Sequence, residues 1–277
     1  MNRRDALRLA GTGTLGAAVT GSATGAALAQ GQGHARSGVL VPQDQVHERA
    51  RAVPAGGGGL GRQQLVWSGD PATPRIALTF DDGPDPAFTP QVLRSLAAVG
   101  GRATFFMMGH NARAHPSLAA QVAAEGHEIA THTAEHLPLA LQSPAETNDQ
   151  VEQGLNAVRH LGPIRWFRPP RGELTGSATV AAARLDLDIA MWSVSARVMG
   201  LESRAAWTER VAAAIGPGDI VLLHDGIGRG TFYPEYVFAG KIRRRRERET
   251  AALDDLLESL RDRGLEFVTV SELVDPA

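Results

Sequence analysis

Two clusters of side chains in this 277-residue chain have the types and spacing of a metal site. Asp81 and Asp82 are adjacent, and His132 and His136 stand four residues apart. Two histidines at i and i+4 share one side of a helical turn, and one aspartate oxygen completes a set of three ligands for a divalent ion. Water and a substrate can then take the remaining positions, which predicts a catalytic metal. The alternative is two surface histidines on a loop that bind nothing.

The composition limits such a site to histidine and carboxylate ligands. The chain has no cysteine, which excludes disulfides, thiolate-bound zinc, iron–sulfur clusters, a thiol nucleophile and a lipidated cysteine. The 28 Lys and Arg residues nearly balance the 30 Asp and Glu residues, and the net charge of -2 does not indicate binding to nucleic acid or an acidic membrane surface. With 43% hydrophobic residues, the chain can bury a full core.

Short apolar runs alternate with helical patterns from about residue 75 onward. The runs predicted as strands are residues 76–80, 103–107, 128–131, 166–168, 189–194, 220–224 and 267–270. The helical patterns include residues 89–99, 116–124, 145–161, 204–215 and 250–263. Seven strands with intervening helices predict a parallel sheet, and a domain of about 200 residues suits a distorted (β/α) barrel. A doubly wound open sheet is the second choice.

The side chains that could do chemistry follow several of these strands. Asp81 and Asp82 come after the first, His132 comes after the third, Arg168 closes the fourth and His224 ends the sixth. The carboxyl ends of the strands form one face of a (β/α) barrel, and this face is the catalytic one. The fold would therefore bring these residues into a single site.

The same strings of residues resemble a known family. They are Thr79-Phe80-Asp81-Asp82-Gly83, His132-Thr133-Ala134-Glu135-His136, Arg168-Pro169-Pro170-Arg171-Gly172 and Leu222-Leu223-His224. The set resembles four of the five motifs of the polysaccharide deacetylases, also called the NodB-homology domain or carbohydrate esterase family 4. The resemblance covers about residues 75–275, and Gly126-His127-Glu128 and residues 267–273 fit the same family.

The resemblance implies a role for each motif residue. The ligands of a divalent metal, with zinc as the expected ion and cobalt as the alternative, would be Asp82, His132 and His136. Asp81 would be the general base, Arg168 would orient it, and His224 would be the general acid. The residues implied to bind substrate are Pro169, Arg171, Gly172, Trp192 and Leu222.

The physical chemistry of acetyl removal agrees with these roles. An amide or ester carbonyl needs a Lewis acid on its oxygen and an activated water, which a metal ion and a carboxylate base supply together. An amine leaves poorly unless it is protonated, and a histidine can deliver that proton at neutral pH. Backbone N–H groups near residues 169–172 or after His136 could share the charge on the tetrahedral oxygen.

The fourth motif departs from the family pattern. The family has the form Trp-x-Val-Asp-x-x-Asp-Trp, whereas this chain has Trp192-Ser193-Val194-Ser195-Ala196-Arg197-Val198-Met199. Ser195 and Val198 therefore replace both acids, and the family's carboxylate partner for the acid histidine is missing. In the third motif, Arg171 replaces an aromatic or small residue, which would change a subsite or favour an anionic substrate.

The N-terminal residues predict export. Arg3 and Arg4 precede a mildly apolar run, and Ala27-Leu28-Ala29 is typical of a signal-peptidase site. The paired arginines resemble a twin-arginine signal; an ordinary secretory signal or a short anchoring helix is the alternative. We expect an export signal over residues 1–29, a flexible linker over 30–73 with a short ordered part near Leu65, and the catalytic domain over 74–277. No stable membrane insertion is expected, and the mature protein is predicted to be secreted or in the cell envelope.

Residues 226–246 interrupt the alternation of strands and helices. They carry an aromatic cluster (Phe232, Tyr233, Tyr236 and Phe238) and the run Arg243-Arg244-Arg245-Arg246. The run is interpreted as a solvated helix start or loop leading into a helix, with a patch for an anionic polymer as the alternative. The aromatic rings either stack on sugars or pack the loop onto the domain.

The leading hypothesis is a metal-dependent hydrolase that removes N-acetyl or O-acetyl groups from an extracellular polysaccharide. Peptidoglycan, chitin-like oligomers, an exopolysaccharide and xylan all fit. One alternative is a weakly active or non-catalytic glycan-binding domain, although Asp81 would then have no purpose. The other is a small-molecule amidohydrolase of the same superfamily, which the predicted export disfavours. No nucleic-acid partner and no oligomeric state are predicted.

Overall fold

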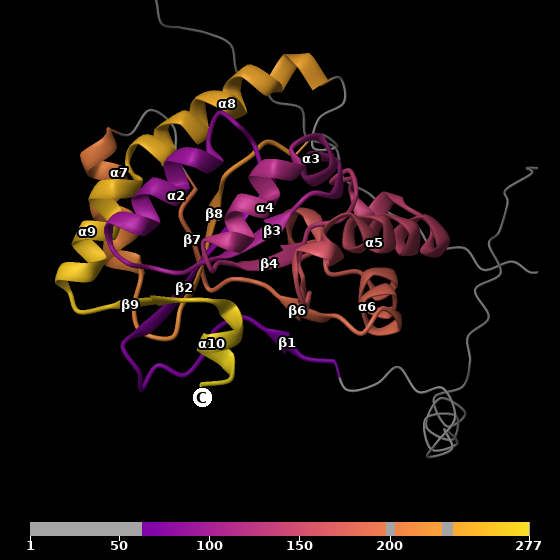
Figure 1. Ribbon diagram of the computed structural model, residues 1–277, viewed down its shortest axis with the longest axis horizontal. Coiled ribbons are helices and arrows are strands. Elements are labelled where there is room, and N and C mark those ends of the chain that lie inside the picture. Colours follow the sequence, from indigo (N-terminus) through magenta and orange to yellow (C-terminus); the bar gives the residue numbers. More distant parts are fainter. Residues whose placement is uncertain (1–62, 198–202, 229–234, 277) are drawn as a thin grey trace, which may run out of the picture. The chain divides into compact units, whose positions relative to one another are not determined.

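The computed structural model describes residues 63–197, 203–228 and 235–276 (Figure 1). The predicted export signal and the predicted linker up to residue 62 lie outside the described residues. The short ordered part expected near Leu65 is present as strand β1 (Leu65–Val66), which pairs with β6 (Asp188–Ala190). The folded domain therefore begins before Arg75, the residue near which we expected it to start. Within the described part, no helix is long and apolar enough to cross a bilayer.

The described strands form one sheet, and every ladder between them is parallel, as predicted. Besides β1 and β6 they are β2 (Arg75–Asp81), β3 (Thr104–Met107), β4 (Glu128–Thr131), β5 (Trp166–Phe167), β7 (Val194–Ser195), β8 (Ile220–His224) and β9 (Glu266–Val268). Their order is β1-β6-β5-β4-β3-β2-β8-β7, and β9 pairs with β2.

The sheet curls into an incomplete barrel because one short segment joins its two ends. We predicted a single strand over residues 189–194, which is wrong: β6 pairs with β1 and β5, whereas β7 pairs with β8 at the far end of the sheet. Only a few residues separate β6 from β7, and an extended chain covers at most about 3.6 Å per residue, so the two ends must approach each other. Met191 N–H donates to Val66 and Ser193 N–H donates to Ile220 across this junction. The structure therefore confirms the predicted (β/α) barrel and not the doubly wound open sheet, which was the second choice.

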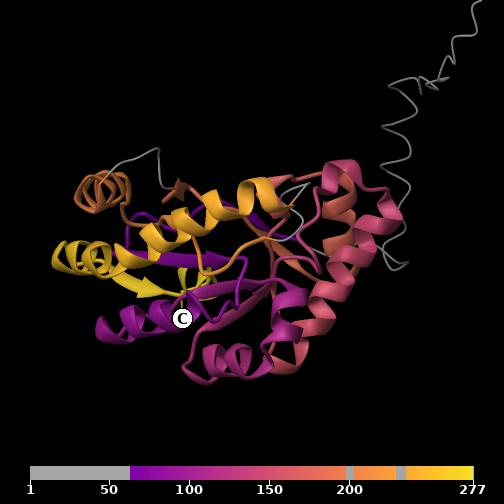
Figure 2. The ribbon, with the colours of Figure 1, turned by 90° about the horizontal axis from the view of Figure 1, so that it is seen from above.

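Helices surround the sheet, with α5 and α6 packed together at one side and α2, α7 and α9 at the other (Figures 1 and 2). The helices are α2 (Thr89–Ala98), α3 (Gly109–Ala114), α4 (Pro116–Ala124), α5 (Pro144–Val158), α6 (Gly176–Arg184), α7 (Arg204–Ala214), α8 (Glu235–Ala251), α9 (Leu253–Asp262) and α10 (Val270–Val274). Short 3₁₀ turns are η1 (Leu139–Leu141), η2 (Arg159–Leu161) and η3 (Pro170–Gly172).

Three predicted elements have different bounds in the structure. The predicted strand 267–270 stops at Val268, because Thr269 caps α10 in a reciprocal capping box with Glu272. The predicted strand 166–168 stops at Phe167, and Arg168 belongs to the site instead. The helix predicted over 250–263 is present as α9 but begins later, at Leu253, because residues 250 and 251 are the last residues of α8.

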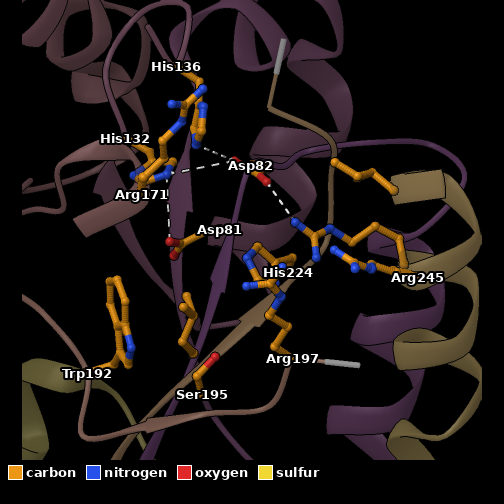
Figure 3. Close-up of a pocket in the computed structure, with 13 residues that line it drawn as sticks. Asp81, Asp82, His132, His136, Arg171, Trp192, Ser195, Arg197, His224 and Arg245 are labelled. Carbon is orange, nitrogen blue, oxygen red and sulfur yellow. Dashed lines mark hydrogen bonds and ion pairs between the residues drawn. The ribbon is translucent and has the colours of Figure 1, made fainter. Parts of the chain in front are cut away.

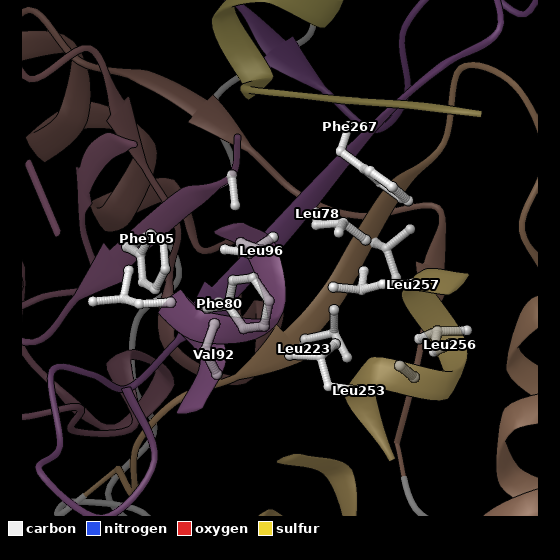
Figure 4. Packing of buried hydrophobic residues seen from close by; sticks show 14 of the residues in the cluster. Leu78, Phe80, Val92, Leu96, Phe105, Leu223, Leu253, Leu256, Leu257 and Phe267 are labelled. Carbon is white, nitrogen blue, oxygen red and sulfur yellow. The ribbon is translucent and has the colours of Figure 1, made fainter. Parts of the chain in front are cut away.

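The largest core cluster packs the sheet against α2 and α9 (Figure 4). Phe80 of β2 stacks on Phe105 of β3 with ring centroids 5.1 Å apart. From the helices come Val92, Leu96, Leu253, Leu256 and Leu257, all buried. Strand β2 is buried on both faces, as expected for a central strand of a parallel sheet covered by helices. This rigid strand ends at Asp81.

Pairing along the sheet aligns the ends of neighbouring strands. Asp81 at the end of β2 lies in register with His224 at the end of β8 and with Phe106 of β3. Met107 of β3 is paired with Thr131 of β4, the residue before His132. The carboxyl ends of these strands therefore place both aspartates and the first histidine along one edge, as predicted.

Gly154 lets α5 lie directly on the loop that follows β4. A Cβ atom at this position would come within 2.6 Å of the Thr133 carbonyl carbon and 2.8 Å of the Thr131 hydroxyl oxygen. Replacing a mid-helix glycine by alanine ordinarily stabilises a helix by about 0.5–1 kcal/mol, but here the helix and the loop must move apart. We expect Gly154→Ala to lower the free energy of unfolding by about 1–3 kcal/mol in denaturant titrations.

Gly176 offers a matched control, because it lies in the first turn of α6 and a Cβ atom there would meet nothing within 4 Å. Gly176→Ala should leave the free energy of unfolding unchanged or raise it slightly. Equal effects of the two substitutions would contradict the close approach of α5 to the loop.

Candidate active site

Asp82, His132 and His136 form a buried cluster at the carboxyl end of the sheet (Figure 3). One ligand atom from each lies within 4.8 Å of the others. Asp82 Oδ1 lies 3.3 Å from His136 Nε2 and 3.7 Å from His132 Nε2. Among the described residues, this is the one group of three or more His, Asp or Glu side chains that lie close enough together to hold a metal ion. The structure thus brings together the three predicted ligands.

The two histidines are brought together by a loop and not by the helical turn that their spacing suggested. Thr133 and His136 have positive φ angles of 68° and 56°, conformations that a helix does not contain. The amide of His136 donates to the Thr133 hydroxyl, which closes the loop, and the two imidazole centroids are 5.0 Å apart. The helical part of the prediction was wrong, although the rings lie side by side as expected.

A hydrogen bond to His132 and the burial of His136 leave both rings suited to binding a metal. His132 Nδ1 lies 2.7 Å from the Arg168 carbonyl oxygen, which only accepts, so Nδ1 donates to it and Nε2 is the ring nitrogen that faces Asp82. Burial lowers the pKa of His136 to about 4 against the attraction of Asp82, so this ring is neutral at neutral pH. Neutral imidazole is the form that coordinates a cation.

Asp82 is held so that one carboxylate oxygen remains for a cation. Its backbone has a φ of 77°, and the side chain of Asn111 donates to its carbonyl oxygen at 2.7 Å. Arg246 donates to Oδ2 at 3.1 Å, whereas Oδ1 is buried and accepts no hydrogen bond from the described residues. Burial alone would raise the pKa of Asp82. At the low pH where this carboxyl titrates, His136 is protonated, and its charge together with that of Arg246 outweighs burial and holds the pKa well below its ordinary value. An orphaned carboxylate oxygen between two imidazole nitrogens fits a bound divalent ion.

Asp81 points into the same cavity but has different partners. Arg168 donates to Asp81 Oδ1 at 2.7 Å, and Asp81 Oδ2 lies 3.6 Å from His132 Nε2. Arg168 is fully buried beneath the site and also donates to Thr79, Ala190 and Met191. With each donor group fixed, the guanidinium can hold Asp81 in one orientation, which is the role that the family resemblance implied for Arg168.

His224 has a carboxylate partner that the sequence did not predict. The loss of the fourth-motif acid at Ser195 suggested that His224 lacks one. In the structure, Glu249 of α8 accepts from the backbone N–H of His224 at 2.6 Å, and the same oxygen lies 3.3 Å from His224 Nδ1. No motif marks Glu249, which stands 25 residues away in a highly charged stretch.

The arginine run lies within α8 and not in a solvated loop. Arg243 and Arg244 are exposed, but Arg246 is only 12% exposed and reaches Asp82 and Glu249. Arg246 Nε also donates to the Gly226 carbonyl oxygen at 2.9 Å. The interpretation of the run as wholly solvated was therefore wrong. Of the predicted aromatic cluster, Phe232 and Tyr233, together with the side chains of Tyr236 and Phe238, lie outside what the structure describes.

A cavity of about 320 Å³ opens onto these groups. Its lining includes three of the predicted substrate-binding residues, namely Arg171, Trp192 and Leu222, and also Ser195, Arg197 and Arg245. Pro169 and Gly172 are not part of this lining. Gly172 instead lies against Trp192, because a Cβ atom there would come within 2.7 Å of the indole ring. The fourth-motif position Val198 lies outside the described residues.

The fold and the site together define a parallel (β/α) barrel enzyme with an Asp–His–His cluster that could hold a cation and a separate buried aspartate at the ends of its strands. Comparison with known sequences gives the family. The sequence model described as "Polysaccharide deacetylase" matches residues 68–190, which end just before the divergent fourth motif. The chain belongs to the polysaccharide deacetylase family, as the sequence predicted.

Named relatives and a solved structure agree with this assignment. The chain is 36% identical to a chitooligosaccharide deacetylase of Sinorhizobium fredii over 69% of its own length and 87% of the relative. It is 35% identical to a peptidoglycan-N-acetylglucosamine deacetylase of Bacillus cereus, covering 72% and 87%. The crystal structure of the Bc1960 peptidoglycan N-acetylglucosamine deacetylase superposes with a TM-score of 0.65 at 30% identity, covering 78% of this chain and 94% of that one.

Proposed function

We propose that this protein is a secreted, metal-dependent deacetylase that hydrolyses N-acetyl groups on an extracellular glycan containing N-acetylglucosamine. The observation that carries the proposal is the joint placement, on one cavity, of the Asp82–His132–His136 cluster and the Arg168-held carboxylate of Asp81. A protein that only holds a metal or a glycan does not need the second carboxylate. The named activities of the relatives support the same chemistry.

The residues that would hold the metal are Asp82, His132 and His136. When bound, the ion supplies a Lewis acid for the acetyl carbonyl oxygen and lowers the pKa of a water. A site of two histidines and one carboxylate suits zinc, with cobalt as the alternative.

The protein's own residues would move the protons. Asp81, fixed by Arg168, accepts a proton from the attacking water, and the water oxygen adds to the acetyl carbonyl carbon. His224 donates a proton to the sugar nitrogen as the carbon–nitrogen bond breaks. The products are acetate and a free amine. Since Asp81 Oδ1 is bound to Arg168, Oδ2 is the oxygen left to accept the proton.

The rim of the cavity favours a glycan that carries negative charge. Arg197 and Arg245 line the cavity, and burial together with the charges of Arg197 and Arg246 lowers the pKa of Arg245. A carboxylate on the substrate would relieve this repulsion and pair with the planar guanidinium groups. We therefore favour peptidoglycan, whose chains carry carboxylates, over neutral chitin-like oligomers. Such a substrate lies outside the cytoplasm, as does a protein exported by the signal predicted over residues 1–29.

Acetate release from a substrate panel tests the proposal. The protein is incubated with peptidoglycan fragments, neutral chitooligosaccharides and O-acetylated xylan, before and after treatment with a chelator and after addition of zinc or cobalt. We expect release that the chelator abolishes and the metal restores, with a higher kcat/KM on the peptidoglycan fragments. The absence of acetate release from every N-acetylated glycan would refute the proposed function.

A further inference from the structure

Helix α8 supplies a carboxylate to His224, the histidine whose partner acid is missing from the fourth motif. Ser195, in β7, pairs in register with Leu222, two residues before His224. A hydroxyl at Ser195 brings no negative charge to the imidazole. Glu249, from an element that follows β8 in the chain, approaches His224 instead and is only 2% exposed.

Both contacts between Glu249 and His224 converge on one oxygen. Glu249 Oε1 lies 2.6 Å from the backbone nitrogen of His224 and 3.3 Å from Nδ1. An ionised carboxylate only accepts hydrogen bonds, so Nδ1 must carry a proton to donate to it. The ring is thereby held in one tautomer and one orientation. Its second nitrogen, Nε2, is the one left for a substrate in the cavity that His224 lines.

The carboxylate of Glu249 is itself fixed from the other side. Arg246 Nη1 lies 3.4 Å from Glu249 Oε2, one turn away on the same helix. The same guanidinium donates to Asp82 Oδ2 and to the Gly226 carbonyl. The Glu249 carboxylate therefore lies between His224 and Arg246. Its contacts on both sides keep it oriented toward His224.

We propose that Glu249 is the positioning residue of the acid His224, and that it replaces the carboxylate missing from the fourth motif. This inference rests on the proposed deacetylation, in which His224 protonates the leaving amine. Glu249 acts through His224 and does not touch the substrate. The arrangement explains how a chain with Ser195 in place of the motif acid can keep a functional acid.

A double-mutant cycle tests the coupling. Glu249→Gln, His224→Ala and the double variant are compared with the parent on the N-acetylated glycan that the parent deacetylates best. Glutamine keeps the size of the side chain and an acceptor for the backbone N–H, but it removes the charge. We expect Glu249→Gln to lower kcat by about 10- to 100-fold with little change in KM, and to cause no further loss when His224 is already alanine. Equal losses in both backgrounds would overturn the proposal.

Glu247 provides the matched control, because it is an exposed glutamate on the same helix. Glu247→Gln should keep the parental kcat. The zinc content of each variant is measured alongside, since Arg246 connects Glu249 to Asp82. If Glu249→Gln loses metal in proportion to its activity, Glu249 supports the metal site and the proposal is wrong.

A spectroscopic measurement on the zinc-loaded protein separates this proposal from the deacetylase activity. Long-range ¹H–¹⁵N spectra report which imidazole nitrogen carries the proton, and the signals absent from His224→Ala identify His224. We expect the parent to show His224 protonated at Nδ1, and Glu249→Gln to change this pattern while Glu247→Gln does not. An unchanged pattern in Glu249→Gln would refute the positioning role, whether or not the protein releases acetate.

Discussion

Replacing His132 by alanine is expected to remove the bound metal and nearly all acetate release while the barrel stays folded. His132 supplies Nε2 to the cluster, and its Nδ1 bond to the Arg168 carbonyl fixes the ring. Loss of a partner that only orients a ligand typically costs 10- to 100-fold in metal affinity or activity, so loss of the ligand itself should cost more than about 100-fold. Metal content by mass spectrometry and acetate release measure the two effects.

The fold should survive because the core does not depend on the site. The strands that carry the cluster are packed by apolar contacts such as Phe80 on Phe105. Circular dichroism should therefore show a cooperative transition in His132→Ala. His160, an exposed histidine in η2, is a suitable control, and His160→Ala should keep both metal and activity. A full complement of zinc in His132→Ala would show that the ion is held elsewhere.

Much of the fold and of the site could be predicted from the sequence because the signals are local. A buried strand such as β2 is a continuous apolar run, and the residue that follows it must lie at its carboxyl end. Parallel pairing then aligns these ends, so that Asp81 and His224 become neighbours although they are far apart in the chain. The strand positions thus limited where each motif residue could lie.

The features that the sequence did not reveal depend on contacts between distant segments. Nothing in residues 189–194 indicates that the strand changes partner at Trp192, because the exchange follows from closure of the barrel. Glu249 lies in a stretch so rich in charge that a solvent-exposed helix was the natural prediction. Only the packing of α8 against the site shows that Arg246 and Glu249 face inward. Site side chains that belong to no motif, such as these two, can thus be recognised only once the fold is known.

Replacing Asp81 by asparagine is expected to preserve the metal and to lower kcat by about 100-fold or more, the effect of removing a general base. An asparagine amide oxygen can still accept from Arg168, so the side chain keeps its place, but it no longer takes a proton from water. The substitution also removes the counterion of the buried Arg168, so we expect Asp81→Asn to have a lower melting temperature than the parent. Its kinetics are therefore measured well below that melting temperature.

Asp82→Asn is the matched comparison, because the two aspartates are adjacent and equally buried but have different partners. Asp82 contributes Oδ1 to the cluster, whereas Asp81 is bound to Arg168. Asp82→Asn should therefore lose metal affinity, and high zinc concentrations should recover part of its activity. In Asp81→Asn, added zinc should recover none, because the missing group is a base and not a ligand. Recovery of Asp81→Asn by zinc, with no recovery of Asp82→Asn, would mean that the two residues have the opposite roles.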